Sequence, residues 1–314
     1  MSDAEELRQL AAGLAAPQKH VDSKYFYDQR GSELFDEITT LAEYYPTRTE
    51  VRLLERWAAP LVEQVGPSAL LELGAGSARK TRLLLGPLER VSPGATYIPL
   101  DVSDVFLAET ARELRAEFPR LRVTPLVGDF TRDIELREPL PRPALFALLG
   151  STIGNFDDER AIGILSHVTE HMRSGDRLLL GVDLRPGPTK PKEELEAAYN
   201  DGRGVTEEFN LNLLRVLNDR YATDFDPSDF EHVAFYDDAR HRIEMHLKAR
   251  RASTVLVPGV GTVDFESGET LRTEISRKYD RVGIESIFRR SGLEIAEWLD
   301  ADDRYALAVG RVRT

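Results

Sequence analysis

Between residues 69 and 182, short apolar segments alternate with longer amphipathic ones, and this alternation constrains the fold more than any other feature of the sequence. The apolar segments cover residues 69–73, 97–100, 122–126, 144–149 and 177–182, while residues 80–88, 105–118 and 162–172 have helical spacing. Strands that alternate with helices form a parallel sheet covered on both faces. Right-handed crossovers then predict a doubly wound, Rossmann-like α/β layer.

The flanking segments have different patterns. The first 65 residues predict helices, with apolar positions at helical spacing in residues 31–38 and 50–65. A Pro- and Gly-rich break at residues 185–192 predicts a domain boundary, and beyond it lie a helical region (193–218) and a strand (242–250). A helix at 284–290 and strands at 293–298 and 305–309 predict a return to the first sheet. We therefore expect an inserted α+β domain at residues 189–278, within a domain of residues 1–188 and 279–314.

The composition excludes several classes of function. The chain has 41 Lys and Arg against 54 Asp and Glu, a net charge of −13, which disfavours binding to nucleic acid or to anionic lipid. It has no cysteine, which excludes disulfides, thiolate nucleophiles and Cys-ligated zinc. We expect no membrane span, a cytoplasmic location and a monomer with an acidic surface. His167 and His171 stand four residues apart without a completing carboxylate, so we expect no metal.

A glycine-rich turn, residues 74–81 (Gly-Ala-Gly-Ser-Ala-Arg-Lys-Thr), follows the first apolar segment. It can be compared with three ligand-binding loops. A P-loop needs a second glycine, and a dinucleotide loop needs a third small residue, at the position of Arg79. The pattern Glu72-x-Gly74-x-Gly76 fits S-adenosylmethionine, which has no pyrophosphate and so does not require that residue.

Acidic residues follow the next two predicted strands. Asp101 is placed to accept hydrogen bonds from both ribose hydroxyls, and Asp129 and Phe130 to meet the amine and the ring of adenine. The carboxyl ends of parallel strands are where open α/β sheets bind ligands. Together with the glycine turn, these residues predict a class I, S-adenosylmethionine-dependent methyltransferase fold.

Five further motifs resemble those of the histidine-specific Nα-methyltransferases of ergothioneine biosynthesis, and the resemblance extends from about residue 25 to residue 311. The motifs lie at residues 25–35, 43–50, 149–156, 199–201 and 273–276. The resemblance implies three successive methylations of the α-amine of L-histidine to give hercynine, with one S-adenosylmethionine consumed per transfer. It also implies a Rossmann-type domain with an inserted substrate domain, and a reaction that requires no metal.

By motif position, the resemblance also implies roles for individual residues. For the cofactor, these are Gly74, Lys80, Asp101, Asp129, Phe130 and Gly150. For L-histidine they are Tyr27, Tyr44, Asn155, Tyr199, Met245, Glu274 and Ser276, with Asn155 and Tyr44 as the catalytic pair. Glu274 and Ser276 are two apart on an extended segment, so they project from one face and can together orient the imidazole.

Two alternatives stay open. The same scaffold could methylate another aromatic amino acid, such as a tryptophan derivative, although an indole would leave a buried Glu274 unpaired at a cost of about 1–3 kcal/mol. The chain could also bind S-adenosylmethionine without turnover. No residue stands out as a general base, so we expect the substrate ammonium to lose its proton to water, helped by the nearby sulfonium charge.

Overall fold

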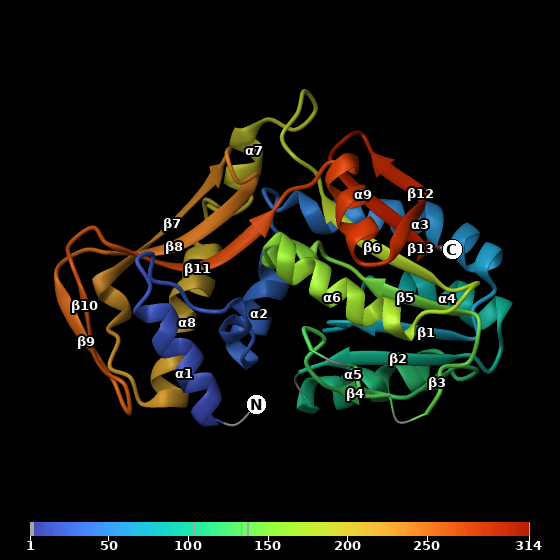
Figure 1. Ribbon diagram of the computed structural model, residues 1–314, viewed down its shortest axis with the longest axis horizontal. Helices are drawn as coiled ribbons and strands as arrows, with labels where there is room; N and C mark the ends of the chain where they lie inside the picture. The colour runs from blue at the N-terminus through green and yellow to red at the C-terminus, as the bar shows by residue number, and fades with distance from the viewer. Residues whose placement is uncertain (1–2, 103, 133, 137, 314) are drawn as a thin grey trace. The chain divides into compact units, whose positions relative to one another are not determined.

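The computed structural model describes residues 3–102, 104–132, 134–136 and 138–313 (Figure 1). These residues form two compact units. The small unit comprises Met1–Tyr45 and Lys190–Arg277, and the large unit comprises Pro46–Thr189 and Lys278–Thr314. Within the described ranges, the chain therefore crosses from one unit to the other at 45/46, 189/190 and 277/278.

The large unit is built on a mostly parallel sheet of order β12-β13-β6-β5-β1-β2-β3, with β4 also paired to β2. Neighbours from β3 to β6 run parallel, and β13 runs antiparallel to both β6 and β12. The strands are β1 (Ala69–Leu73), β2 (Thr96–Asp101), β3 (Arg122–Val123), β4 (Leu126–Val127), β5 (Ala144–Leu148), β6 (Arg177–Asp183), β12 (Leu293–Ala301) and β13 (Tyr305–Val312). The predicted Rossmann-like layer is confirmed.

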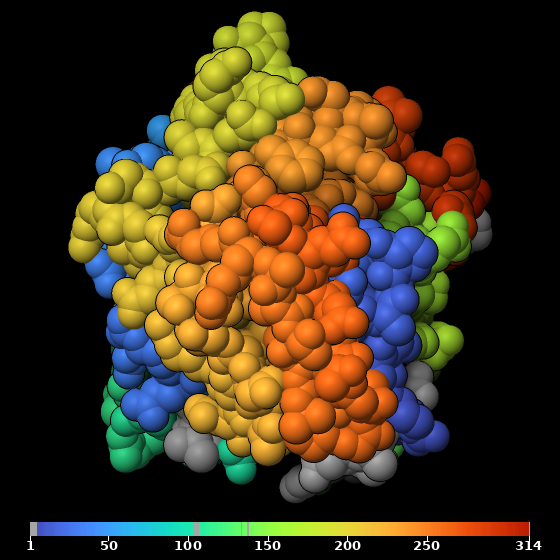
Figure 2. Space-filling view, turned by 90° about the vertical axis from the view of Figure 1, so that its left-hand side faces the viewer, coloured from blue at the N-terminus to red at the C-terminus, as the bar shows by residue number. Residues whose placement is uncertain are grey.

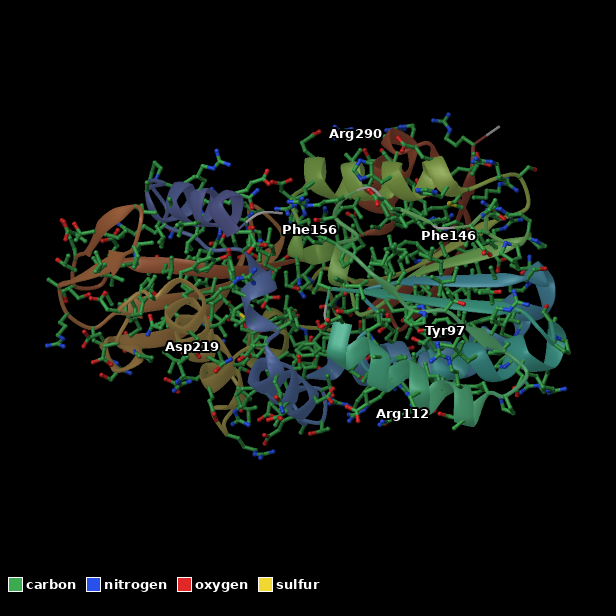
Figure 3. All side chains as sticks on the ribbon, turned by 90° about the horizontal axis from the view of Figure 1, so that it is seen from below. Tyr97, Arg112, Phe146, Phe156, Asp219 and Arg290 are labelled. Atoms are coloured by element: carbon green, nitrogen blue, oxygen red, sulfur yellow. The ribbon has the colours of Figure 1, made fainter. Side chains whose placement is uncertain are left out.

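Both faces of this sheet are covered by helices. Leu71 and Phe146 pack with α6 (Asp158–His171) and α9 (Arg281–Arg290) on one face. Leu70 and Tyr97 pack on the other face with α3 (Tyr45–Val65), α4 (Arg82–Val91) and α5 (Asp104–Glu117). Tyr97 and Phe146 are labelled in Figure 3, inside the large unit. Because both faces are buried, β1 and β5 are apolar along nearly their whole length.

One predicted strand is interrupted. The sequence predicts a single strand over residues 122–126, but the structure has the separate strands β3 and β4, which pair with the beginning and the end of β2. Pro125 lies between them and has no N–H group to continue the ladder of hydrogen bonds.

The small unit combines helices with antiparallel strands. A sheet of order β11-β8-β7 is formed by β7 (Phe230–Asp237), β8 (Arg242–Ala249) and β11 (Thr270–Arg277), and β9 (Ser253–Val257) pairs with β10 (Gly261–Phe265). The helices are α1 (Asp3–Leu14), α2 (Gln29–Ile38), α7 (Lys192–Ala197) and α8 (Val205–Tyr221), with short 3₁₀ turns at Ser23–Phe26 and Pro227–Asp229. Figure 2 shows one face of this unit, where residues of α8 (yellow) lie beside those of the strand region (orange).

The placement of the N-terminal segment corrects the predicted domain assignment. Residues 1–45 are predicted from the sequence to belong to the sheet domain, whereas the structure includes them in the small unit. The Phe26 ring stacks on Phe209 of α8 at 4.5 Å, and the Asp28 carboxylate accepts a hydrogen bond of 2.9 Å from Asn212. The apolar face of this segment is therefore buried against α8. Of the described helices, none is both long enough and apolar enough to span a membrane.

Candidate functional site

The glycine turn follows β1 and is tied to the end of β2. Gly74 and Gly76 have φ of +70° and +49°, a backbone region that glycine adopts without strain. The N–H groups of Gly74 and Ala75 donate to the carbonyl of Leu100 at 2.9 and 3.1 Å. The N–H of Gly76 donates to Oδ2 of Asp101 at 2.9 Å. The structure thus brings Asp101 to the turn.

Phe130 also lies against this turn. A Cβ placed on Gly74 would be 3.3 Å from Cε1 of Phe130, so the missing side chain leaves room for the ring. The ring of Phe130 also meets that of Phe156 edge-on at 6.2 Å. Asp129 closes its own turn, because its Oδ1 accepts hydrogen bonds from the N–H (3.0 Å) and the hydroxyl (2.6 Å) of Thr131. The predicted contact of Asp129 with adenine stays a prediction.

Beneath the turn lies the buried carboxyl group of Glu72. It accepts hydrogen bonds from the hydroxyls of Thr81 and Tyr97, both at 2.5 Å. Burial raises the pKa of Glu72 to about 7, although these two hydrogen bonds and the charge of Lys80 lower it. The acidic residue of the Glu-x-Gly-x-Gly pattern therefore supports the loop from inside the unit.

Sequence reasoning missed Glu50, a fully buried glutamate on α3. Its carboxylate forms an ion pair with Lys80, accepts the N–H of Gly150 at 2.8 and 3.0 Å, and accepts the hydroxyl of Tyr305 at 2.7 Å. Nothing in the local sequence distinguishes this position from an exposed helical glutamate. Its membership of the motif at residues 43–50 was the one available indication.

The turn after β5 has an unusual backbone. Gly150 and Ser151 have φ of +78° and +55°, and the second value is uncommon for a residue with a side chain. Oγ of Ser151 accepts the N–H of Asp183 at 3.0 Å, which helps to hold this conformation. The turn leads into the 3₁₀ segment Thr152–Asn155, whose last residue is the half-buried Asn155. Gly150 and Asn155 belong to the large unit, as does Lys80 of the glycine turn.

In the small unit, the structure brings together the other residues predicted to bind substrate. The hydroxyl of Tyr199 donates to Oγ of Ser276 at 2.9 Å, and the ring of Tyr44 meets that of Tyr199 edge-on at 6.1 Å. Glu274 lies opposite Met245 in the pairing of β11 with β8. Opposite residues project from the same face of a sheet, so Met245, Glu274 and Ser276 share one face, as predicted for the last two.

A layer of polar residues supports this face. Asn210 of α8 accepts the hydroxyl of Thr273 at 2.7 Å and donates to Nδ1 of His232 at 2.8 Å. His232 in turn donates from Nε2 to the carbonyl of Tyr199 at 2.8 Å. Burial lowers the pKa of His232, consistent with the neutral tautomer that these partners require. Sequence reasoning missed Asn210 and His232.

Tyr27 lies at the edge of this region and is 39% exposed. Its ring meets Phe35 edge-on at 5.8 Å, and Phe35 meets Tyr44 in the same way at 6.3 Å. Across the described ranges, no group of three or more histidine, aspartate or glutamate residues is arranged to hold a metal ion.

Comparisons with known proteins agree with these features. Residues 6–312 match the family model described as histidine-specific methyltransferase, SAM-dependent. The chain is 39% identical to a histidine N-alpha-methyltransferase of Mycolicibacterium smegmatis, over 95% of this chain and 92% of the relative. It is 31% identical to ergothioneine biosynthesis protein 1 of Schizosaccharomyces pombe, over 74% of this chain and 31% of that protein.

Among solved structures, the fold is similar to that of the methyltransferase CcbJ of Streptomyces caelestis. The TM-score is 0.54 at 17% identity, and the alignment covers 94% of this chain and all of that one. At this level of identity the likeness concerns the fold alone, and it agrees with the class I methyltransferase sheet.

Proposed function

The chain belongs to the family of histidine-specific, S-adenosylmethionine-dependent methyltransferases, and from this premise we propose that it methylates the α-amine of L-histidine three times to give hercynine. Its relatives include proteins named for histidine Nα-methylation and for ergothioneine biosynthesis, which supports this reaction as a step of that pathway. The observation that supports the substrate most directly is the shared face of Met245, Glu274 and Ser276, with Tyr199 hydrogen-bonded to Ser276.

The residues that we propose to bind the cofactor belong to the large unit. S-adenosylmethionine supplies a methyl group on a positively charged sulfur. Gly74 and Gly76 let the ligand approach the backbone, and Asp101 accepts the ribose hydroxyls. Phe130 and Asp129 bind the ring and amine of adenine. Lys80 pairs with the carboxylate of the methionyl group, which is the only anionic group of this ligand.

The residues that we propose to bind L-histidine include separate groups for its two ends. Glu274 accepts a charge-assisted hydrogen bond from the imidazole, and Ser276 completes its orientation. Tyr199 and Tyr44 bind the carboxylate end, and Asn155 can both donate and accept, which suits an amine beside a carboxylate. Methyl transfer needs the lone pair of a neutral amine held close to the methyl carbon. Such positioning can lower the activation free energy by several kcal/mol. We propose that the amine releases its proton to water.

Mass spectrometry of L-histidine incubated with the protein and S-adenosylmethionine tests this function, with L-tryptophan and L-tyrosine in parallel. Trimethylated histidine as the sole product would support it. Methylation of tryptophan or tyrosine instead would favour the alternative substrate class, and bound cofactor without any methylated product would favour a non-catalytic binding protein.

Two variants test the role of the imidazole-binding group. We expect Glu274→Gln to raise KM for histidine at least tenfold, because the replaced carboxylate would form a charge-assisted hydrogen bond. Glu285→Gln removes an exposed carboxylate of α9 and is the matched control, with KM unchanged.

We also propose that the protein acts in the cytoplasm and, from its acidic composition, that it is a monomer. Cell fractionation and light scattering test those two points.

A further inference from the structure

The carboxylate of Glu50 fills a space that is open because residue 181 is a glycine. A Cβ on Gly181 of β6 would lie 2.1 Å from Oε1 of Glu50 and 2.8 Å from the hydroxyl of Tyr305. Any side chain at position 181 would therefore displace the buried carboxylate. Both oxygens of Glu50 are satisfied, by the N–H of Gly150, the hydroxyl of Tyr305 and the ammonium of Lys80.

The ion pair fixes Lys80 at one place on the ligand-binding edge. Its Nζ would lie 3.0 Å from a Cβ on Gly150, so the ammonium sits directly against the turn that follows β5. The side chain of Lys80 is 25% exposed, whereas that of Glu50 is fully buried. An ammonium has three donors, so Lys80 can bind Glu50 from inside and a ligand from outside. Without its partner, a lysine side chain would lose rotamer entropy when a ligand fixed it, and this loss would weaken binding of the ligand.

We propose that Glu50 is a positioning residue for the amino-acid end of the cofactor. It holds the ammonium of Lys80 against Gly150, so that this charge is already in place to pair with the ligand carboxylate. Glu50 itself does not touch the ligand. The inference rests on the proposed function only in taking S-adenosylmethionine as the ligand, and it assigns a role to a residue outside the predicted site.

Two ligands that differ only at the relevant end provide the test. S-adenosylhomocysteine has the carboxylate and the amine, whereas 5′-methylthioadenosine keeps the adenosine and the sulfur and lacks both groups. Isothermal titration calorimetry gives Kd for each ligand, without turnover and without histidine. Glu50→Gln keeps the size of the side chain but removes its negative charge, so the neutral amide holds the ammonium of Lys80 less firmly against Gly150. We expect about tenfold weaker binding of S-adenosylhomocysteine, with that of methylthioadenosine changed less than twofold.

The selectivity between the two ligands separates positioning from general destabilisation. If Glu50→Gln merely destabilised the large unit, it would weaken the binding of both ligands alike, and that result would overturn the proposal. Unchanged or tighter binding of S-adenosylhomocysteine would overturn it as well. Lys80→Met should show the same selective loss, and Glu50→Gln combined with Lys80→Met should lose little more than Lys80→Met alone. If Glu50→Gln does not fold, the proposal still fails should Lys80→Met weaken both ligands equally or neither.

A second buried carboxylate serves as the matched control. Asp176 accepts the N–H groups of Ala144 (2.7 Å) and Arg173 (2.6 Å) and pairs with Arg142, at the beginning of β5 rather than at its end. Asp176→Asn should lower the melting temperature and leave the ratio of the two Kd values unchanged. The proposed function can fail separately: a wild-type protein that binds S-adenosylhomocysteine but leaves histidine unmethylated would refute the substrate and leave the role of Glu50 testable by the same titrations.

Discussion

Replacing the buried Glu72 by glutamine should change how the free energy of unfolding depends on pH. Burial raises the pKa of Glu72 from 4.5 to about 7 in the folded protein. Between these two pH values the folded state holds a proton that the unfolded state has released. The free energy of unfolding of the wild-type protein should therefore fall as pH rises from about 4.5 through 7, and this contribution should then level off.

The size of the effect follows from the shift in pKa. A change from 4.5 to about 7 corresponds to about 3 kcal/mol, at roughly 1.4 kcal/mol per unit. Glutamine cannot ionise, and its amide can still bond the hydroxyls of Thr81 and Tyr97, which both donate and accept. When pH is raised from 5 to 8, we expect the free energy of unfolding of Glu72→Gln to rise by about 2–3 kcal/mol relative to that of the wild type.

Urea unfolding at pH 5, 6, 7 and 8, followed by tryptophan fluorescence, measures this difference. Trp57 and Trp298 both belong to the large unit, so their emission reports on the unit that contains Glu72. Glu285→Gln, an exposed substitution in the same unit, should change the free energy of unfolding by less than about 0.5 kcal/mol at each pH. A difference between Glu72→Gln and the wild type that is equal at pH 5 and pH 8 would refute the reasoning.

Three further predictions concern single contacts. In Gly31→Ala, the new Cβ would lie 1.6 Å from a backbone carbonyl oxygen, so thermal unfolding should show that the free energy of unfolding falls by more than about 3 kcal/mol. Gly163→Ala, where the new Cβ meets no atom within 4 Å, should instead raise the free energy of unfolding by roughly 0.5–1 kcal/mol. Gly181→Ala should reproduce the selective loss of S-adenosylhomocysteine affinity, because its Cβ would displace the carboxylate of Glu50; equal affinities for the wild type and this variant would contradict the steric argument. Tyr199→Phe and Ser276→Ala remove the same hydrogen bond, so each should raise KM for histidine by about three- to tenfold and the double variant by less than the product of the two effects; fully additive effects in steady-state kinetics would show that the two side chains act independently.

The features that the sequence predicts well depend on local backbone rules. Apolar runs and glycines define where the strands of the large unit end, so the approach of Asp101 to the glycine turn could be predicted without coordinates. Alternation along an extended segment likewise places Glu274 and Ser276 on one face. The break in the third strand also has a local cause, Pro125, which cannot donate a hydrogen bond to the ladder, but the prediction of one strand over residues 122–126 overlooked it.

What the sequence does not predict depends on partners far along the chain. Glu50 and Glu55 are both glutamates on one helix, but only Glu50 is buried, because Gly181 leaves room for its carboxylate. Helical periodicity in residues 1–45 indicates which face is buried but not what covers it, so the assignment of this segment to the sheet domain was wrong. The role of Asp129 cannot be predicted from its identity alone, since a turn and a ligand contact both favour an acid at that position.

The three crossings between the units have a consequence for synthesis on the ribosome. The helices of residues 3–45 are synthesised before α8 and the strands that cover them, which follow only after the 144 residues from Pro46 to Thr189. At about 5–20 residues per second, this delay lasts roughly 7–30 seconds. During that time the apolar side chains of Phe26 and Leu34 have no native partner on α8, so we expect this segment of the nascent chain to be exposed to chaperones.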